Sequence, residues 1–291
     1  MPRNRAVEAH HFEAMGTSCS LFAVGLTRGR LLEGEFWVRR LGARLTRFSP
    51  DSELSRLNAA AGRWTGVSPE LEALLRESLR AYEMSAGLVN VGVLPSLLAI
   101  GYTRSLDLGP PTEPRMGAAG PTTQAPSVPI VTAPPLPPLP EVLSVRPGEA
   151  LIKAGSGVDL GGVAKGWMAD RLREQLGPNA LANLGGDLSA GGPGPHGDGW
   201  PVGLAGVTVM LRDRGAATSS VRRRRWGDLH HLIDPRSGVP ARTGLEEVSV
   251  VADDGFEAEV VAKTALLLGP ELAATYCAAN ALAWWLREAV R

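Results

Sequence analysis

The chain has 291 residues, 44% of them hydrophobic, and its 30 basic side chains equal its 30 acidic ones, for a net charge of +0. This length allows one large domain or two closely packed ones, and the neutral balance gives no support to a nucleic-acid partner. Cys19 and Cys277 lie far apart and form no metal or disulfide pattern, which indicates a reducing environment. The N-terminus lacks the apolar core of a signal peptide, and no apolar run is long enough for membrane insertion. We therefore expect a cytoplasmic protein.

The first hundred residues alternate between apolar patterns and turn signals. Residues 11–24 are predicted to form a strand broken at Met15-Gly16-Thr17, and residues 31–48 a helix with one apolar face. A second helix is predicted over residues 68–85, where Ser68 is a suitable N-cap and Pro69 fits the first helical position. The glycine-punctuated apolar stretch that follows would serve equally as a pocket wall or as plain core.

Residues 103–148 lose this periodicity and hold roughly half of the chain's prolines. We expect a long surface excursion, extended or flexible, inserted within a domain. Its removal is predicted to leave folding almost unchanged, because loop closure costs little per residue.

The first chemical cluster is a glycine turn at 156–170, SGVDLGGVAKGWMAD. Apolar residues at helical spacing predict a helix from about Gly162, and glycines let the backbone approach a ligand closely. A lysine in the first turn, Lys165, makes this a candidate phosphate site, and Asp159 is suited to accept a hydrogen bond. A strand-to-helix turn with a surface lysine explains the pattern equally well.

The second cluster lies at 216–238, AATSSVRRRRWGDLHHLIDPRSG. Thr218 supplies a hydroxyl, and of the adjacent His230 and His231 only one can face a pocket if the segment is a strand. Asp234 begins a turn, so the segment brings together the residue types of proton transfer; a buried, hydrogen-bonded histidine is the structural alternative. The basic run 222–225 is predicted to be a solvated hairpin, with a phosphate or an acidic partner as the minor alternative.

The C-terminal part is predicted to hold a strand at 246–252 and a helix at 257–269. Glu259 and Lys263 stand at i and i+4 of this helix, in the favourable order for an ion pair. The last segment is a short helix followed either by a strand or by more helix.

In their order and spacing, these motifs resemble the FAD:protein FMN transferases of the ApbE type. The likeness covers nearly the whole chain apart from the proline-rich stretch. It rests on MGT at 15–17, PDSELSRLN from Pro50, VDLGGVAKG at 158–166, NLGGD at 183–187, ATSS at 217–220 and HLIDPRSG at 231–238. The resemblance implies one α+β domain over 1–291, in which a mixed or antiparallel sheet is covered by helices.

The resemblance also implies the ligands and the site. Such enzymes bind FAD and Mg²⁺, transfer FMN to a threonine or serine hydroxyl of an acceptor protein and release AMP. By position, the catalytic residues would be His231 and Asp234, and the metal would face the Gly162 carbonyl and Glu259, with Lys263 at a third ligand position. FAD would contact Met15, Phe48, Leu88, Val89, Asn90, Asp159, Lys165, Thr218, Leu232 and Ile233.

Three departures from the family pattern affect five positions. Glu259 and Lys263 replace an aspartate and a threonine that ligate the metal, and a charged lysine has no lone pair to offer. Val91-Gly92 replaces Pro-Thr, and Ser220 replaces glycine. The hypothesis is an active flavin transferase. The alternatives are a flavin-binding paralogue in which the Lys263 ammonium replaces the metal, and a hydrolase that cuts a phosphate ligand with water.

Overall fold

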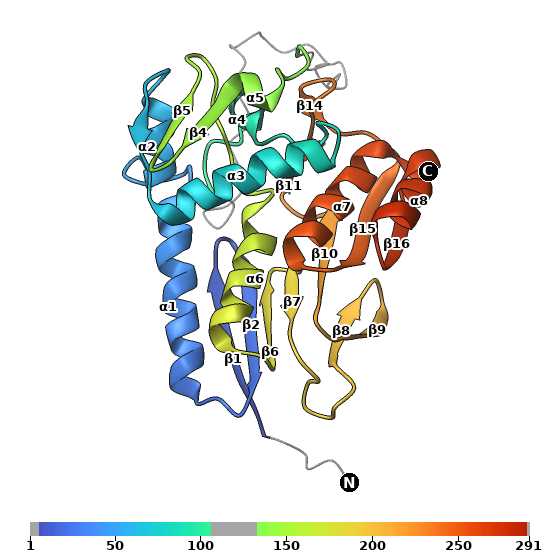
Figure 1. Cartoon of the computed structure of the whole chain (residues 1–291). Coiled ribbons are helices and arrows are strands. Elements are labelled where there is room, and N and C mark those ends of the chain that lie inside the picture. The colour runs from blue at the N-terminus through green and yellow to red at the C-terminus, as the bar shows by residue number, and fades with distance from the viewer. Residues whose placement is uncertain (1–5, 106–132, 290–291) are drawn as a thin grey trace, which may run out of the picture.

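The computed structural model describes residues 6–105 and 133–289, and its centre is an antiparallel sheet of seven strands (Figure 1). The strand order is β1-β2-β6-β7-β10-β15-β16, and every neighbouring pair is antiparallel. The strands are β1 (Val7–Ala14), β2 (Thr17–Val24), β6 (Ala180–Leu184), β7 (Leu188–Ala190), β10 (Arg214–Ser220), β15 (Leu245–Ala252) and β16 (Ala283–Glu288). The predicted α+β fold is therefore confirmed, with an antiparallel sheet.

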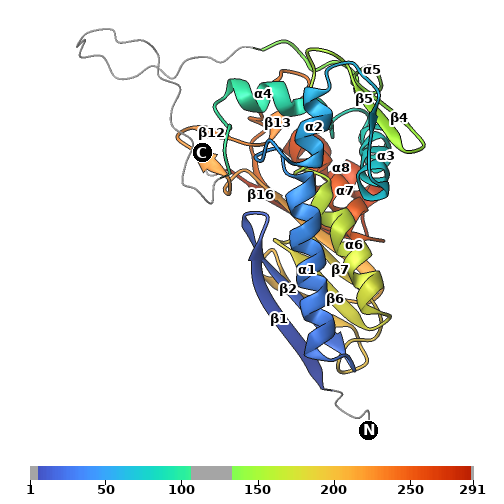
Figure 2. The same ribbon diagram turned by 90° about the vertical axis from the view of Figure 1, so that its left-hand side faces the viewer.

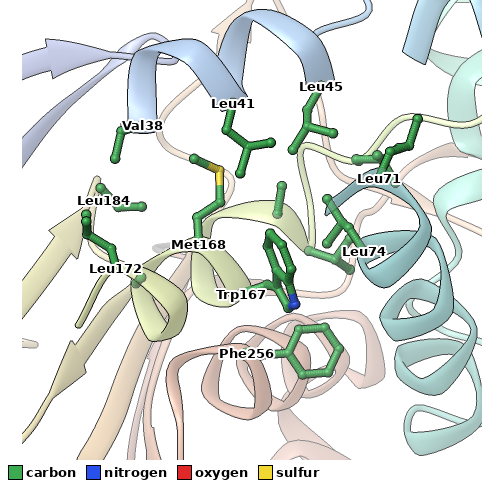
Figure 3. Close-up of a cluster of buried hydrophobic side chains, with 14 of the residues drawn as sticks. Val38, Leu41, Leu45, Leu71, Leu74, Trp167, Met168, Leu172, Leu184 and Phe256 are labelled. Carbon is green, nitrogen blue, oxygen red and sulfur yellow. The ribbon is translucent and has the colours of Figure 1, made fainter. Parts of the chain in front are cut away.

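Three helices cover one face of this sheet: α1 (Arg28–Leu45), α6 (Ala164–Leu176) and α7 (Gly255–Leu268) (Figure 2). The helix α8 (Pro270–Asn280) packs beside α7. Trp167 and Met168 of α6 meet leucines of α1 and Phe256 of α7 in the core between them (Figure 3). Among the described residues, no helix combines the length and the apolar character that crossing a bilayer requires.

The hairpin β8 (Trp200–Leu204) and β9 (Val207–Leu211) packs on the other face of the sheet. Leu181 packs with Trp200 and Val202, whereas its neighbours Ala180 and Ala182 belong to the helix-covered core. This division follows from the two-residue period of a strand, which sends alternate side chains to opposite faces.

A second layer lies over one end of the sheet. It holds α2 (Glu53–Ala59), α3 (Pro69–Met84), η1 (Val91–Val93), α4 (Leu94–Ala99), α5 (Leu139–Val142) and a small sheet of β3 (Thr65–Gly66), β5 (Glu149–Ile152) and β4 (Leu143–Arg146). Two short strand pairs, β11 (Arg225–Trp226) with β12 (Leu229–His230) and β13 (Ile233–Asp234) with β14 (Val239–Pro240), complete the structure.

The predicted excursion at 103–148 is wrong for its C-terminal part. Leu139, Val142 and Leu143 are buried in the main core, and β4 pairs with β5. The prolines misled the interpretation, because a proline in the first turn begins a helix rather than preventing one, as it does in α5. The part of the predicted excursion at 106–132 lies outside the described residues.

Other boundaries were predicted closely. Ser68 caps α3 by accepting from the Leu71 amide, and Pro69 is its first residue. Met15-Gly16 is a two-residue hairpin turn between β1 and β2, with φ of 53° and 69°, rather than a break within one strand. Residues 180–204 hold three strands, and the last segment is the strand β16.

Candidate functional site: a cation-rich cavity beside the central sheet

A cavity of about 1270 Å³ lies where the sheet, α6, α7 and the second layer meet. Every predicted site residue lines it except Asp234. Met15 and Phe48 come from the N-terminal part, Leu88, Val89 and Asn90 from the segment before η1, and Thr218 from β10, and the others are Asp159, Gly162, Lys165, His231, Leu232, Ile233, Glu259 and Lys263. Residues from the two ends of the chain thus converge on one space.

The glycine turn before α6 is held by hydrogen bonds of Asp159, both within the turn and to residues outside it. The Asp159 amide donates to the Val91 carbonyl at 2.8 Å, and Asp159 Oδ1 accepts from the Gly161 amide at 2.8 Å. The other carboxylate oxygen accepts from Arg47 Nε at 2.5 Å. Asp159 therefore pairs with Arg47 and not with Lys165.

Arg47 is a site residue that the sequence interpretation missed. Its side chain is 4% exposed, and its guanidinium carbon lies 4.2 Å from the ring centre of Phe48 and 4.7 Å from that of Tyr102. Within the described part of the chain, its buried Nη2 has no hydrogen-bond partner. A buried guanidinium normally satisfies its donors, so this nitrogen is an unsatisfied donor in a residue that lines the cavity.

Lys165, in the first turn of α6, is surrounded by carboxylates. Its ammonium donates to Asp187 and lies 3.5 Å from Glu259 Oε1, while Glu259 Oε2 accepts from the Gly166 amide at 2.9 Å. Burial lowers the pKa of Lys165 to about 8, against the opposing effect of Glu259. Asp187 is buried and is the nearest partner of this lysine.

Lys263 lies at the position where the resemblance places the metal. Its ammonium donates to the Gly162 carbonyl and lies 3.9 Å from Glu259 Oε1. A Cβ atom at residue 162 would collide with this ammonium, so the contact requires glycine there. The donor set does not fit Mg²⁺, because both expected oxygen ligands face lysine ammonium groups. Among the described residues, no group of three or more histidine, cysteine or acidic side chains is arranged to hold a metal ion.

The two adjacent histidines have different environments. His230 is buried outside the cavity, where its Nε2 bonds the Ala241 carbonyl at 2.8 Å and its Nδ1 accepts from the Leu232 amide at 3.3 Å. His231 lines the cavity, and its buried Nδ1 has no partner among the residues that the structure describes. Burial, together with the charges of Arg224 and Lys263, holds the pKa of His231 well below its ordinary value. The His231 ring is therefore neutral at neutral pH and able to accept a proton.

Two other predicted residues are tied to structure. Asp234 does not reach the cavity: its carboxylate accepts from the Arg236 amide at 2.9 Å and pairs with the Arg236 guanidinium at 2.7 Å. It stabilises the turn that follows His231. Thr218 lines the cavity, with its hydroxyl 2.9 Å from that of Ser249.

The basic run 222–225 is only partly the solvated hairpin that was predicted. Arg222, Arg223 and Arg225 are exposed and Arg224 is half-buried, and of the four Arg223 and Arg224 line the cavity. Charge alone could not distinguish the four side chains, because the difference depends on how the flanking segments pack.

A seven-stranded antiparallel sheet under helices, with a cavity where cations meet a neutral histidine, defines an α+β protein with a cation-rich ligand site. The model of the ApbE family matches residues 15–285. The chain belongs to the ApbE family.

Relatives and solved structures agree with this assignment. The chain is 30% identical to the FAD:protein FMN transferase of Treponema pallidum, over 76% of this chain and 66% of that protein. It is 33% identical to that of Klebsiella pneumoniae, over 41% of this chain and 40% of that protein. Both matches span less than two thirds of the relative's length.

The fold matches the apo flavinyl transferase ApbE of Pseudomonas stutzeri, with a TM-score of 0.78, 21% identity and coverage of 97% of this chain and 93% of that one. It also matches the ApbE protein of Thermotoga maritima, with a TM-score of 0.79, 20% identity and coverage of 97% and 94%.

Proposed function

We propose that this protein is an FAD:protein FMN transferase, which transfers FMN from FAD to a threonine or serine hydroxyl of an acceptor protein and releases AMP. Family membership and relatives bearing that name support the proposal. The observation that carries it is the neutral His231, which lines a cavity also lined by Lys165 and Lys263 and has a ring nitrogen without a partner among the described residues. A proton acceptor beside ammonium groups is what attack of a hydroxyl on a diphosphate requires.

In the proposed reaction, the acceptor's hydroxyl oxygen attacks the phosphorus of the FMN half. A new phosphoester bond forms, and the bond between that phosphorus and the bridging oxygen of the diphosphate breaks. AMP leaves with the bridging oxygen, and the hydroxyl proton passes to the neutral imidazole of His231. Lys165 neutralises charge on the phosphates, which costs no reorganisation because Asp187 and Glu259 already position its ammonium.

The flavin end of FAD is assigned to the part of the cavity lined by Met15, Phe48 and Leu88 to Asn90. Phe48 offers an aromatic face and is held in a T-shaped contact with Tyr102, with ring centres 5.6 Å apart. Arg47, whose Nη2 has no partner among the described residues, lines the same part of the cavity.

One observation favours a second candidate, a flavin-binding paralogue with slow or absent transfer. The Lys263 ammonium supplies a positive charge where a metal ion would lie. It also occupies the Gly162 carbonyl oxygen that the metal would use as a ligand. Under either candidate, lysine ammonium groups supply the neutralising charge at this place, and no step is assigned to Mg²⁺.

The test is incubation with FAD and a threonine-bearing acceptor domain, in Mg²⁺ and separately in EDTA. Mass spectrometry of the acceptor detects the addition of FMN, and chromatography detects AMP. Transfer in either condition supports the transferase. FAD binding without transfer identifies the paralogue, and AMP and FMN released without any modified acceptor identify the hydrolase.

A further inference from the structure

The arginine run is held against the cavity by an anchor at each end. At one end, the Val221 amide donates to the Glu246 carbonyl at 3.0 Å, which ties the run to β15. At the other, Trp226 stacks on Tyr102 with ring centres 5.1 Å apart, and its Nε1 donates to the Ile100 carbonyl at 3.3 Å. The segment between these anchors cannot swing freely into solvent.

The outer and inner arginines of the run differ in their partners. Arg222 lies 3.8 Å from Glu246 and Arg225 lies 3.7 Å from Asp228, so both outer guanidinium groups have a carboxylate nearby. Arg223 and Arg224 line the cavity, and neither forms an ion pair within residues 6–105 and 133–289. The backbone of Arg224 is left-handed, with φ of 50°, a conformation that costs energy in a residue other than glycine and is found at functional sites.

The surroundings of Arg224 are already positive. Its charge acts on Lys165, Lys263 and His231, and it opposes the protonation of each of them. The carboxylates that act on these groups are Asp187 and Glu259, which the two lysines already engage, and Asp159, which Arg47 engages. Since a third cation without its own carboxylate is repelled by the lysines, this part of the cavity is suited to a ligand with more than one negative charge.

We propose that Arg224 binds the diphosphate of FAD together with Lys165 and Lys263. The inference rests on the proposed function, because it takes FAD as the ligand. A guanidinium suits this role, since its fork of donors binds two phosphate oxygens at once, which an ammonium cannot do. Arg224 thus supplies a positive charge to the phosphates at a site where the residues present do not fit a metal ion.

The test compares Arg224→Gln with the matched control Arg222→Gln, which removes an arginine from the same run that does not line the cavity. Affinity is measured by fluorescence titration with FAD and, separately, with riboflavin, which has no phosphate. Arg224→Gln should weaken FAD binding about ten- to hundredfold and reduce its salt dependence, since a charge-assisted contact is lost. Riboflavin affinity should stay within about twofold, and Arg222→Gln should bind both ligands within about twofold of the unmodified chain.

The possible failures point to different conclusions. Unchanged FAD affinity in Arg224→Gln would overturn the proposal, and an equal loss of riboflavin affinity would assign Arg224 a structural role. Unchanged FAD affinity with a raised KM for the acceptor would place Arg224 on the acceptor surface instead. If the unmodified chain binds FAD but transfers nothing, the proposed function fails while the role of Arg224 stands.

Discussion

The ammonium of Lys263 donates a hydrogen bond to the carbonyl oxygen of Gly162, a residue 101 positions earlier in the chain. This contact joins the turn before α6 to the middle of α7. It also places a monovalent side-chain cation where the resemblance to the flavin transferases implies a divalent metal ion.

The first prediction concerns this cation. FAD affinity of the unmodified protein should be the same in Mg²⁺ and in EDTA, because the Lys263 ammonium and the metal exclude one another. The double variant Glu259→Asp with Lys263→Thr restores the oxygen ligands of the family and should acquire Mg²⁺-dependent binding and transfer. Titration calorimetry with FAD and acceptor mass spectrometry measure the two effects. A steep Mg²⁺ requirement in the unmodified protein would show that Lys263 lies outside the metal shell.

The two histidines provide a second prediction. Replacing His231 by Asn should lower the rate of FMN transfer about 10²- to 10⁴-fold with little change in FAD affinity, since a general base is lost. Replacing His230 by Asn should lower the thermal midpoint and leave the rate per folded molecule nearly intact, because His230 bonds only the backbone. A rate loss in the His230 variant equal to that of the His231 variant would contradict these assignments.

The third prediction is a pH dependence set by Lys165. Its pKa is about 8 in the free protein. Burial lowers this pKa most, Glu259 raises it, and the charges of Arg224 and Lys263 lower it further. Because only the protonated ammonium attracts phosphate, FAD affinity should fall about tenfold as the pH rises from about 7 to about 9.5. Lys165→Gln should bind FAD more weakly, with a nearly flat pH profile, and an unchanged slope in this variant would assign the titration to another group.

The lowered pKa of Lys165 also affects the stability of the ligand-free protein. This stability should rise with pH, whereas the FAD affinity should fall. The folded-state pKa of Lys165 lies below the ordinary value of 10.5, so between about 8 and 10.5 the unfolded chain binds more protons than the folded one. This group therefore raises the free energy of unfolding as the pH rises through that window. Urea titrations of the ligand-free protein at several pH values, compared with Lys165→Gln, isolate the contribution.

The fourth prediction tests the packing of the segment around α5. Leu139→Ala should lower the free energy of unfolding by about 2–5 kcal/mol, because Leu139 is fully buried in the main core and its loss leaves a cavity. The matched control is Leu98→Ala in α4, where the side chain is 47% exposed and the expected change is below about 0.5 kcal/mol. Equal effects of the two substitutions in urea unfolding would contradict this packing.

The sequence predicted local structure well where the signal is local. Ser68 and Pro69 locate the start of α3 because capping depends only on neighbouring backbone groups. The glycine turn before α6 and the Glu259–Lys263 spacing also bring residues to the cavity as expected. What failed depends on distant contacts: the burial of Leu139 needs the main core, and the pairing of Lys165 with Asp187 needs β6 and β7 beside α6.

The site residues missed from the sequence share this cause. Arg47 follows a helix and looks like an ordinary surface arginine until Asp159, Phe48 and Tyr102 surround it. Arg224 is equivalent to its neighbours in the run until β15 and Tyr102 fix the ends of the segment. The aspartate that follows two glycines at Asp187 is a signal in the sequence that could have indicated a site residue there.

The placement of α7 has a consequence for synthesis on the ribosome. Lys165 and Asp187 are made early, whereas Glu259 and Lys263 follow only after the strands β10 and β15. Until then, the Gly166 amide lacks its acceptor and the Gly162 carbonyl its donor. A nascent chain that ends before residue 255 therefore presents an incomplete cavity. If the proposed function holds, the chain binds FAD only after α7 has left the exit tunnel and docked. Flavin binding would then report that translation has passed α7.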